Sequence, residues 1–147
     1  MKRIVVAVDG SESSLRAVSH ALKLKKLSSH MHVTAFYVGP SCYDLFPEPG
    51  ACSGFQQKEL DKEIESRANE VFKKIDRLAG QKSSIIEKAI GRGDAAAVIS
   101  KFAMEGGFDL VIMGFHGYDE EEGSRFWLGG VCYKVLHMCQ CPVTIVK

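Results

Sequence analysis

Two short glycine-containing motifs hold the residues whose types and spacing could bind a ligand. They are Asp9-Gly10-Ser11 and Gly114-Phe115-His116-Gly117, and each directly follows a short apolar run. The aspartate can accept hydrogen bonds from a sugar hydroxyl or the edge of a purine, and the glycines let backbone N–H groups come close to an anion. A helix starting near Gly129 and Gly130 would add N–H donors and a dipole that favours negative charge. Together these features predict a site for a phosphate-bearing ligand, although turn and helix-start chemistry alone is the better explanation of Asp9, Ser11 and Glu12 taken by themselves.

A third glycine motif has a simpler explanation. Gly91-Arg92-Gly93-Asp94-Ala95-Ala96 has the G-x-G-x-x-A spacing of a dinucleotide-binding fingerprint. That fingerprint needs an acid near the carboxyl end of the next strand to hold a ribose, whereas Asp109 stands at the beginning of that strand and Gly114 at its end. We therefore predict a tight turn followed by a helix that Asp94 caps.

Five apolar runs, each but the last followed by a stretch with helical periodicity, must position these motifs. The expected strands are Ile4–Val8, Val33–Val38, Ile85–Ile90, Leu110–Met113 and Val143–Val146. Apolar residues three and four apart predict helices around residues 15–22, 60–78, 95–102 and 128–138. This alternation predicts an α/β fold, a single open five-stranded parallel sheet with helices on both faces. The segment Gly39–Gly54 contains three of the four prolines and is predicted to be a long loop.

Composition and charge exclude several classes of protein. The chain has 147 residues, of which 46% are hydrophobic and 25% charged, so we expect one ordinary globular domain over residues 1–147. A formal net charge of +1 provides no broad basic surface for nucleic acid or for an anionic membrane. The first apolar run is too short for a signal sequence or a membrane span, which predicts a cytoplasmic protein.

The cysteines are expected to be reduced thiols. The chain has five, an odd number, and their spacing is no compact disulfide framework. A Cys42–Cys52 disulfide stays open as the less favoured alternative. Cys132, Cys139 and Cys141 could be combined with His137 into a zinc site, but the pattern lacks a paired second half. Packing along one helix explains Cys132 and Cys139 better, so no metal site is predicted.

The combined motifs resemble those of the universal stress proteins, small α/β domains many of which bind ATP. The matching segments are Val6-Ala-Val-Asp9-Gly-Ser11, Val111-Ile-Met-Gly114-Phe-His-Gly117, Leu128-Gly-Gly-Val131 and Cys141-Pro-Val143-Thr-Ile-Val-Lys147. The resemblance extends from one end of the chain to the other. It implies the strand order 3-2-1-4-5, in which the winding direction switches between the first and fourth strands. These are the strands that carry the two motifs, at the place where ligands bind in open α/β sheets.

The resemblance also implies a set of nucleotide-binding residues. Ala7, Asp9 and Val38 would line the adenine and ribose pocket. The residues implied around the ribose and phosphates are Met113, Gly114, His116, Gly117, Gly129, Gly130 and Val131. The implied cofactor is ATP.

Two departures from the family pattern bear on this site. Eleven residues, Tyr118–Leu128, separate Gly117 from Gly129, whereas ATP-binding members have nine at this place. Gly130 stands where those members have a hydroxyl residue that binds phosphate, and Ser124 in the longer loop could replace that ligand. The longer loop also carries Asp119, Glu120, Glu121 and Glu122. A carboxylate about 4 Å from a phosphate repels it by about 4 kcal/mol at an effective dielectric constant of 20, unless a cation such as Mg²⁺ bridges the two. A solvated flap is an equally good explanation of these acids.

The resemblance implies a stress-response module that senses adenine nucleotide and acts through an unknown protein partner. It also implies a homodimer formed through the last strand, Val143–Val146, whose apolar edge would be open to pairing. The alternative is a family member that does not bind ATP and works by protein association or with another small ligand. No Ser-His-Asp, H-E-x-x-H or P-loop pattern is recognisable, so we name no catalytic residue and expect at most slow ATP hydrolysis. Neither a nucleic acid nor a membrane is expected as a partner.

Overall fold

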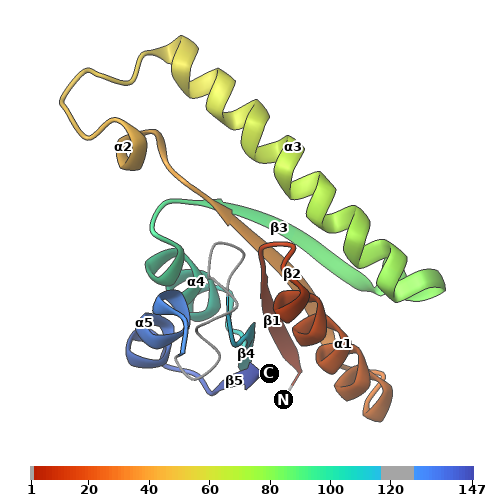
Figure 1. The fold of residues 1–147 in the computed structure, drawn as a ribbon. Helices are drawn as coiled ribbons and strands as arrows, with labels where there is room; N and C mark the ends of the chain where they lie inside the picture. Colours follow the sequence, from red (N-terminus) through yellow and green to blue (C-terminus); the bar gives the residue numbers. More distant parts are fainter. Residues whose placement is uncertain (1, 117–127) are drawn as a thin grey trace.

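The computed structural model describes residues 2–116 and 128–147, and it forms one parallel five-stranded sheet (Figure 1). The strands are β1 (Arg3–Val8), β2 (His32–Gly39), β3 (Ile86–Arg92), β4 (Leu110–Gly114) and β5 (Val143–Val146). They lie in the order β3-β2-β1-β4-β5, and every neighbouring pair is parallel. The predicted α/β class and strand order are therefore confirmed. Each strand differs from its predicted range by no more than two residues at either end.

The helices begin where the sequence supplies capping side chains. They are α1 (Glu12–Leu27), α2 (Cys42–Leu45), α3 (Gly54–Ala79), α4 (Ala95–Glu105) and α5 (Gly130–Met138), and a short 3₁₀ helix, Gly80–Ile85, joins α3 to β3. Ser11, Ser53 and Asp94 each accept a hydrogen bond from a backbone N–H in the first turn of the helix that follows. Such caps satisfy N–H groups that have no partner inside the helix. None of the helices in the described part of the chain is both long and apolar enough to cross a bilayer.

The sheet separates two apolar layers. Side chains alternate along a strand, so Ile4, Val6 and Val8 of β1 pack against α1 and α3, while Val5 packs on the opposite face with α4 and α5. Figure 1 shows these two helix pairs on opposite sides of the sheet. Both layers bury β-branched and aromatic residues, each worth roughly 1.5–3 kcal/mol when fully buried. The second layer, with α4 and α5, is the one that adjoins the candidate site.

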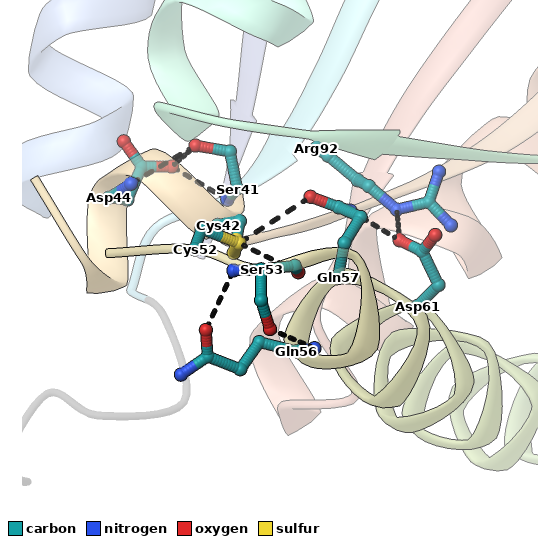
Figure 2. Close-up of a disulfide and its surroundings, with 9 residues drawn as sticks. All are labelled: Ser41, Cys42, Asp44, Cys52, Ser53, Gln56, Gln57, Asp61 and Arg92. Atoms are coloured by element: carbon teal, nitrogen blue, oxygen red, sulfur yellow. Dashed lines mark hydrogen bonds and ion pairs between the residues drawn. A yellow bond between two sulfur atoms is a disulfide. The ribbon is translucent and has the colours of Figure 1, made fainter. Parts of the chain in front are cut away.

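The segment between β2 and α3 corrects two expectations. It is not a plain loop, because it contains α2, and Cys42 and Cys52 form a disulfide rather than remaining reduced (Figure 2). Capping boxes at Ser41 and Ser53 fix the backbone next to each cysteine. The Cα atoms of the two cysteines are 6.1 Å apart, within the usual range of about 4.4–6.8 Å. The ten-residue spacing of the cysteines did not indicate the disulfide. The backbone conformations at the Ser41 and Ser53 capping boxes, and not the spacing, bring the two sulfurs together.

Candidate functional site

A cavity opens at the carboxyl ends of β1 and β4, the two neighbouring strands between which the winding direction changes. Its volume is about 130 Å³, and its walls come from β1, β2, β4, α4 and the starts of α1 and α5. The lining residues are Ala7, Val8, Asp9, Ser14, Phe36, Val38, Ala95, Ile99, Met113, Gly114, His116, Gly129, Val131 and Cys132. Most of these side chains are apolar, and a few polar groups lie along the strand ends, as is typical of small-ligand sites.

Asp9 lies in the turn that joins β1 to α1, and it also faces the cavity. Its Oδ1 accepts a hydrogen bond from the Ser11 N–H at 2.9 Å, and the Ser11 hydroxyl in turn accepts one from the Ser14 N–H at 3.1 Å. Gly10, between them, has a φ of +86°, a conformation that side chains with a Cβ rarely adopt. Turn and capping chemistry therefore explains Asp9 and Ser11, as the sequence indicated. The same turn leaves the half-buried Asp9 side chain at the cavity wall.

Gly114 has a packing role that the sequence did not reveal. A Cβ added to Gly114 would lie 2.6 Å from the carbonyl carbon of Ser13, in the first turn of α1. The Ser13 hydroxyl also accepts a hydrogen bond from the His116 N–H at 3.4 Å. A glycine is thus required here because the backbone of α1 lies against the end of β4. Close approach of an anion is not needed to explain it.

The start of α5 is held against the end of β4. The Gly129 N–H donates to the Phe115 carbonyl at 3.2 Å, and the Cys132 thiol donates to the Gly114 carbonyl at 2.9 Å. Gly129 is the N-cap residue and provides no side-chain cap for this helix. The amino end of α5 therefore stands beside the cavity, with a dipole that favours negative charge.

Most residues implied by the resemblance come together at this cavity. Ala7, Asp9, Val38, Met113, Gly114, His116, Gly129 and Val131 all line it. Gly130 is not among the lining residues, and a Cβ added there would meet nothing within 4 Å. Gly117, Ser124 and the acidic residues 119–122 lie outside the described residues.

Six lining residues were missed: Val8, Ser14, Phe36, Ala95, Ile99 and Cys132. Phe36 precedes Val38 by two positions, so both side chains project from the same face of β2. Ala95 and Ile99 are four residues apart and share one face of α4. The strand periodicity could have found Phe36 once Val38 had been chosen. The helix periodicity links Ile99 to Ala95, but nothing in the sequence pointed to Ala95. No local pattern indicates which turn of α5 brings Cys132 to Gly114.

Charges and burial act together on Tyr37, which packs on the α3 side of β2. Burial raises the pKa of its phenol above the ordinary value of 10.0, the Arg67 guanidinium lowers it, and the carboxylates of Asp9 and Glu63 raise it. The net shift is upward, so the Tyr37 phenol stays neutral at neutral pH.

The Gly91 motif forms the predicted turn and cap. Asp94 Oδ1 accepts a hydrogen bond from the Ala97 N–H at 3.0 Å. Gly93 has a φ of +125°, and its N–H donates to the Gly39 carbonyl at 2.9 Å. A Cβ on Gly91 would lie 2.6 Å from Cζ of Phe36. The glycines therefore serve the turn and the packing of β3 against Phe36.

The cysteines and histidine considered as a zinc site do not assemble. In the part of the chain that the structure describes, no three histidine, cysteine or acidic side chains gather as metal ligands. Cys132 is buried and donates to Gly114, whereas Cys139 and Cys141 lie side by side with their sulfurs 3.4 Å apart. Burial raises the pKa of Cys141 to about 11, and the neighbouring Cys139 and the charge of Asp109 contribute in the same direction.

Comparison with known proteins gives a consistent result. Residues 1–147 match the profile of the universal stress protein family. The chain is 31% identical to the universal stress protein MJ0531 of Methanocaldococcus jannaschii over 146 residues, which is 99% of this chain and 82% of the relative. It resembles the structure of the universal stress protein UspA from Lactobacillus plantarum, with a TM-score of 0.75, 18% identity, and coverage of 99% and 97% of the two chains. It also resembles a family protein from Arabidopsis thaliana solved with AMP bound, with a TM-score of 0.66, 17% identity, and coverage of 100% and 92%.

Proposed function

This chain belongs to the universal stress protein family, and from that premise we propose that it is a stress-response module that binds an adenine nucleotide, ATP or a relative of it, in the cavity between β1, β4 and α5. The observation that carries the proposal is the convergence of four distant segments on one cavity. Asp9, Val38, Gly114 and Gly129 belong to different elements, yet all four line it. The Arabidopsis relative with bound AMP supports an adenine nucleotide as the ligand class.

The walls of the cavity suit the separate parts of a nucleotide. Phe36, Val38 and Ile99 supply apolar surface on which a purine ring can pack. Asp9 supplies a carboxylate that can accept hydrogen bonds from ribose hydroxyls. The volume of about 130 Å³ is below the roughly 300–1,000 Å³ of typical ligand clefts, so we infer that base and ribose enter and the phosphates stay at the mouth, beside the amino end of α5.

One observation favours the alternative that the chain does not bind ATP and works by protein association or with another small ligand. Gly130 stands where ATP-binding members carry a hydroxyl residue, so one expected hydrogen bond to a phosphate is missing. A serine would fit there, since a Cβ at Gly130 meets nothing within 4 Å. A hydrogen bond to a charged group contributes roughly 1.5–3 kcal/mol, which is at least about tenfold in affinity.

Isothermal titration calorimetry with ATP and AMP, each with and without Mg²⁺, tests the proposal. Val38→Phe should weaken binding by roughly 5- to 150-fold, because overfilling the cavity costs about 1–3 kcal/mol. Leu27→Phe is the control, since Leu27 is exposed at the end of α1 and is not among the lining residues. Gly130→Ser should strengthen ATP binding more than AMP binding if the β- and γ-phosphates lie near α5. If titration with ATP and with AMP gave no binding heat for the wild type or for Gly130→Ser, nucleotide binding would be rejected. The alternative, protein association or another small ligand, would then remain.

We further infer that the protein works in the cytoplasm as a homodimer that signals to a protein partner. The position of β5 supports the homodimer alone, since β5 is the last strand of the sheet and has a half-buried, mostly apolar sequence. An edge strand of this kind has backbone groups available for pairing with another chain.

A further inference from the structure

The Cys42–Cys52 disulfide joins the end of β2 to the start of α3. Cys42 follows β2 by three residues, and Cys52 precedes α3 by two. Cys42 is only 6% exposed and packs with Leu60 and Ile64, whereas Cys52 is half-buried. A small thiol in solution can therefore approach the bond from the Cys52 side. Exposed disulfides are more easily reduced than buried ones.

The segment between the two cysteines is not anchored in the core by its own side chains. Residues 43–50 are all exposed, and they include Tyr43, Leu45 and Phe46. The helix within the segment, α2, has four residues, too few to be stable by itself. The segment thus has two states, one tied to the start of α3 by the disulfide and one released from it after reduction.

A series of contacts leads from the disulfide to the end of β3 (Figure 2). The Cys52 sulfur lies 4.0 Å from Oε1 of Gln57. Nε2 of Gln57 donates a hydrogen bond to Oδ1 of Asp61 at 3.0 Å, and the same oxygen lies 3.0 Å from Nε of Arg92. The amide of Gln57 therefore joins the disulfide to the ion pair that holds the last residue of β3.

The end of β3 supports one wall of the cavity. Gly93, directly after Arg92, donates its N–H to the Gly39 carbonyl at 2.9 Å. Gly91, directly before Arg92, lies against Phe36, which lines the cavity. The helix α4 begins three residues after β3 and supplies two more lining residues. A change in how firmly Arg92 is held should therefore reach the cavity wall.

We propose that Cys42 and Cys52 form a reversible dithiol–disulfide switch that sets how firmly the cavity wall at β2, β3 and α4 is held. Its effect on ligand affinity rests on the proposed nucleotide function. In the cytoplasm, where we propose that the protein works, small thiols keep most cysteines reduced, and the disulfides that do form there are usually transient or redox-sensing. Oxidation ties the segment down and preorganises the wall, so the oxidised form should bind nucleotide more tightly.

Reduction by glutathione, a small thiol, balances in two steps. A glutathione thiolate attacks the Cys52 sulfur, the S–S bond breaks, and Cys42 leaves as a thiolate that takes up a proton. A second glutathione thiolate attacks the glutathione sulfur of the mixed disulfide, and Cys52 leaves and is protonated. Two glutathione thiols are oxidised to one glutathione disulfide, and the protein gains two electrons and two protons. Oxidation by glutathione disulfide is the reverse.

Equilibration of the full-length protein in buffers of reduced and oxidised glutathione, without denaturant, tests reversibility. Alkylation followed by peptide mass measurement reads the state of each cysteine. We expect Cys42 and Cys52 to change together, and to return when the glutathione ratio is restored. A bond that opens only when the protein is unfolded would overturn the proposal.

Hydrogen–deuterium exchange of the oxidised and reduced forms tests the effect on the wall and needs no nucleotide. Reduction should speed exchange of residues 36–39 and 93–99 by about fivefold or more, the lower end of usual coupling between sites, and leave residues 17–27 unchanged. Gln57→Ala should keep the disulfide but lose this response, whereas Lys58→Ala, at an exposed neighbouring position, should retain it. Equal exchange in the two wild-type forms would overturn the proposal, as would a full response in Gln57→Ala.

Calorimetry with ATP and AMP on both redox forms tests the effect on affinity. The oxidised form should bind about fivefold more tightly or better. Cys42→Ser/Cys52→Ser should match the reduced form and should not respond to glutathione. Equal affinity of the oxidised and reduced forms would overturn the switch. If neither form bound nucleotide, the proposed function would fail, and hydrogen exchange would still decide whether the switch acts on the wall.

Discussion

Gly114, at the end of β4, lies directly against Ser13 in the first turn of α1. The contact joins two segments far apart in sequence, since a Cβ at Gly114 would stand 2.6 Å from the Ser13 carbonyl carbon. The Gly114 carbonyl also accepts the hydrogen bond from Cys132 of α5. One residue without a side chain therefore lies against the starts of two of the helices that border the cavity, α1 and α5.

Replacing Gly114 with alanine should lower the free energy of unfolding by about 1–3 kcal/mol, the usual cost of overpacking. The cause is steric, because the new Cβ would meet backbone atoms of α1, which cannot rotate away. Urea denaturation measures the loss. Gly54→Ala is the matched control, because a Cβ there meets nothing within 4 Å. Equal stabilities for the two variants would contradict the close contact.

Reduction of the Cys42–Cys52 disulfide should lower the free energy of unfolding by roughly 2–3 kcal/mol, the loop-entropy value for a loop of this size. Urea denaturation with and without dithiothreitol measures the difference. The Cys42→Ser/Cys52→Ser double variant should match the reduced wild type and should not respond to the reductant. If that variant did respond, the effect would belong to the other cysteines.

Asp109 should stabilise the fold in a pH-dependent way. Hydrogen bonds from the Lys2 N–H and then from the Arg3 N–H lower the pKa of its carboxyl below the ordinary 3.8. A group with a lowered folded pKa stabilises the fold above its unfolded pKa, and the contribution disappears as the pH falls through the folded value. The stability of Asp109→Asn should therefore fall below that of the wild type at pH 7 and approach it below about pH 4.

Melting temperatures of the wild type and Asp109→Asn across that pH range measure the effect. Because Asp109 is exposed at the surface, salt should reduce it. Glu65→Gln, on the exposed side of α3, is the control. A gap between the wild type and Asp109→Asn that stays constant down to pH 2 would show that the carboxylate charge is not its cause.

Ile145→Lys should convert the proposed dimer to a monomer, because it places a charge on the edge strand β5. Analytical ultracentrifugation of wild type and variant at matched concentrations measures the change. Lys134→Glu, on the exposed surface of α5, controls for altered charge. If Ile145→Lys kept the wild-type sedimentation coefficient, β5 would not be the interface.

The fold could be predicted almost completely because its determinants are local and repeated. Val33 and Val143 lie in short β-branched runs, and Ser11 and Asp94 cap the helices they precede. Strand order depends on contacts between distant residues, and it came from the motif resemblance instead of from periodicity. The segment around Cys42 was missed because α2 is only four residues long and buries little surface of its own.

The site could be predicted only in part, for a related reason. Asp9 and Gly114 belong to recognisable motifs, whereas Ala95 and Ile99 are ordinary apolar residues whose sequence neighbours give no sign of a cavity. The packing role of Gly114 was not predicted, since its contact with Ser13 joins two elements that the sequence does not connect. Such contacts follow from the packed structure and not from composition.

The longest helix, α3, supplies no residue to the cavity among those the structure describes, although it covers much of the opposite face of the sheet. Apart from Val71 and Lys74, which lie against Gly10 in the turn that carries Asp9, its side chains can therefore drift during evolution, or be redesigned, with consequences for folding and solubility but little for ligand choice. Divergence between paralogues on that side would then be a poor guide to whether they respond to the same molecule.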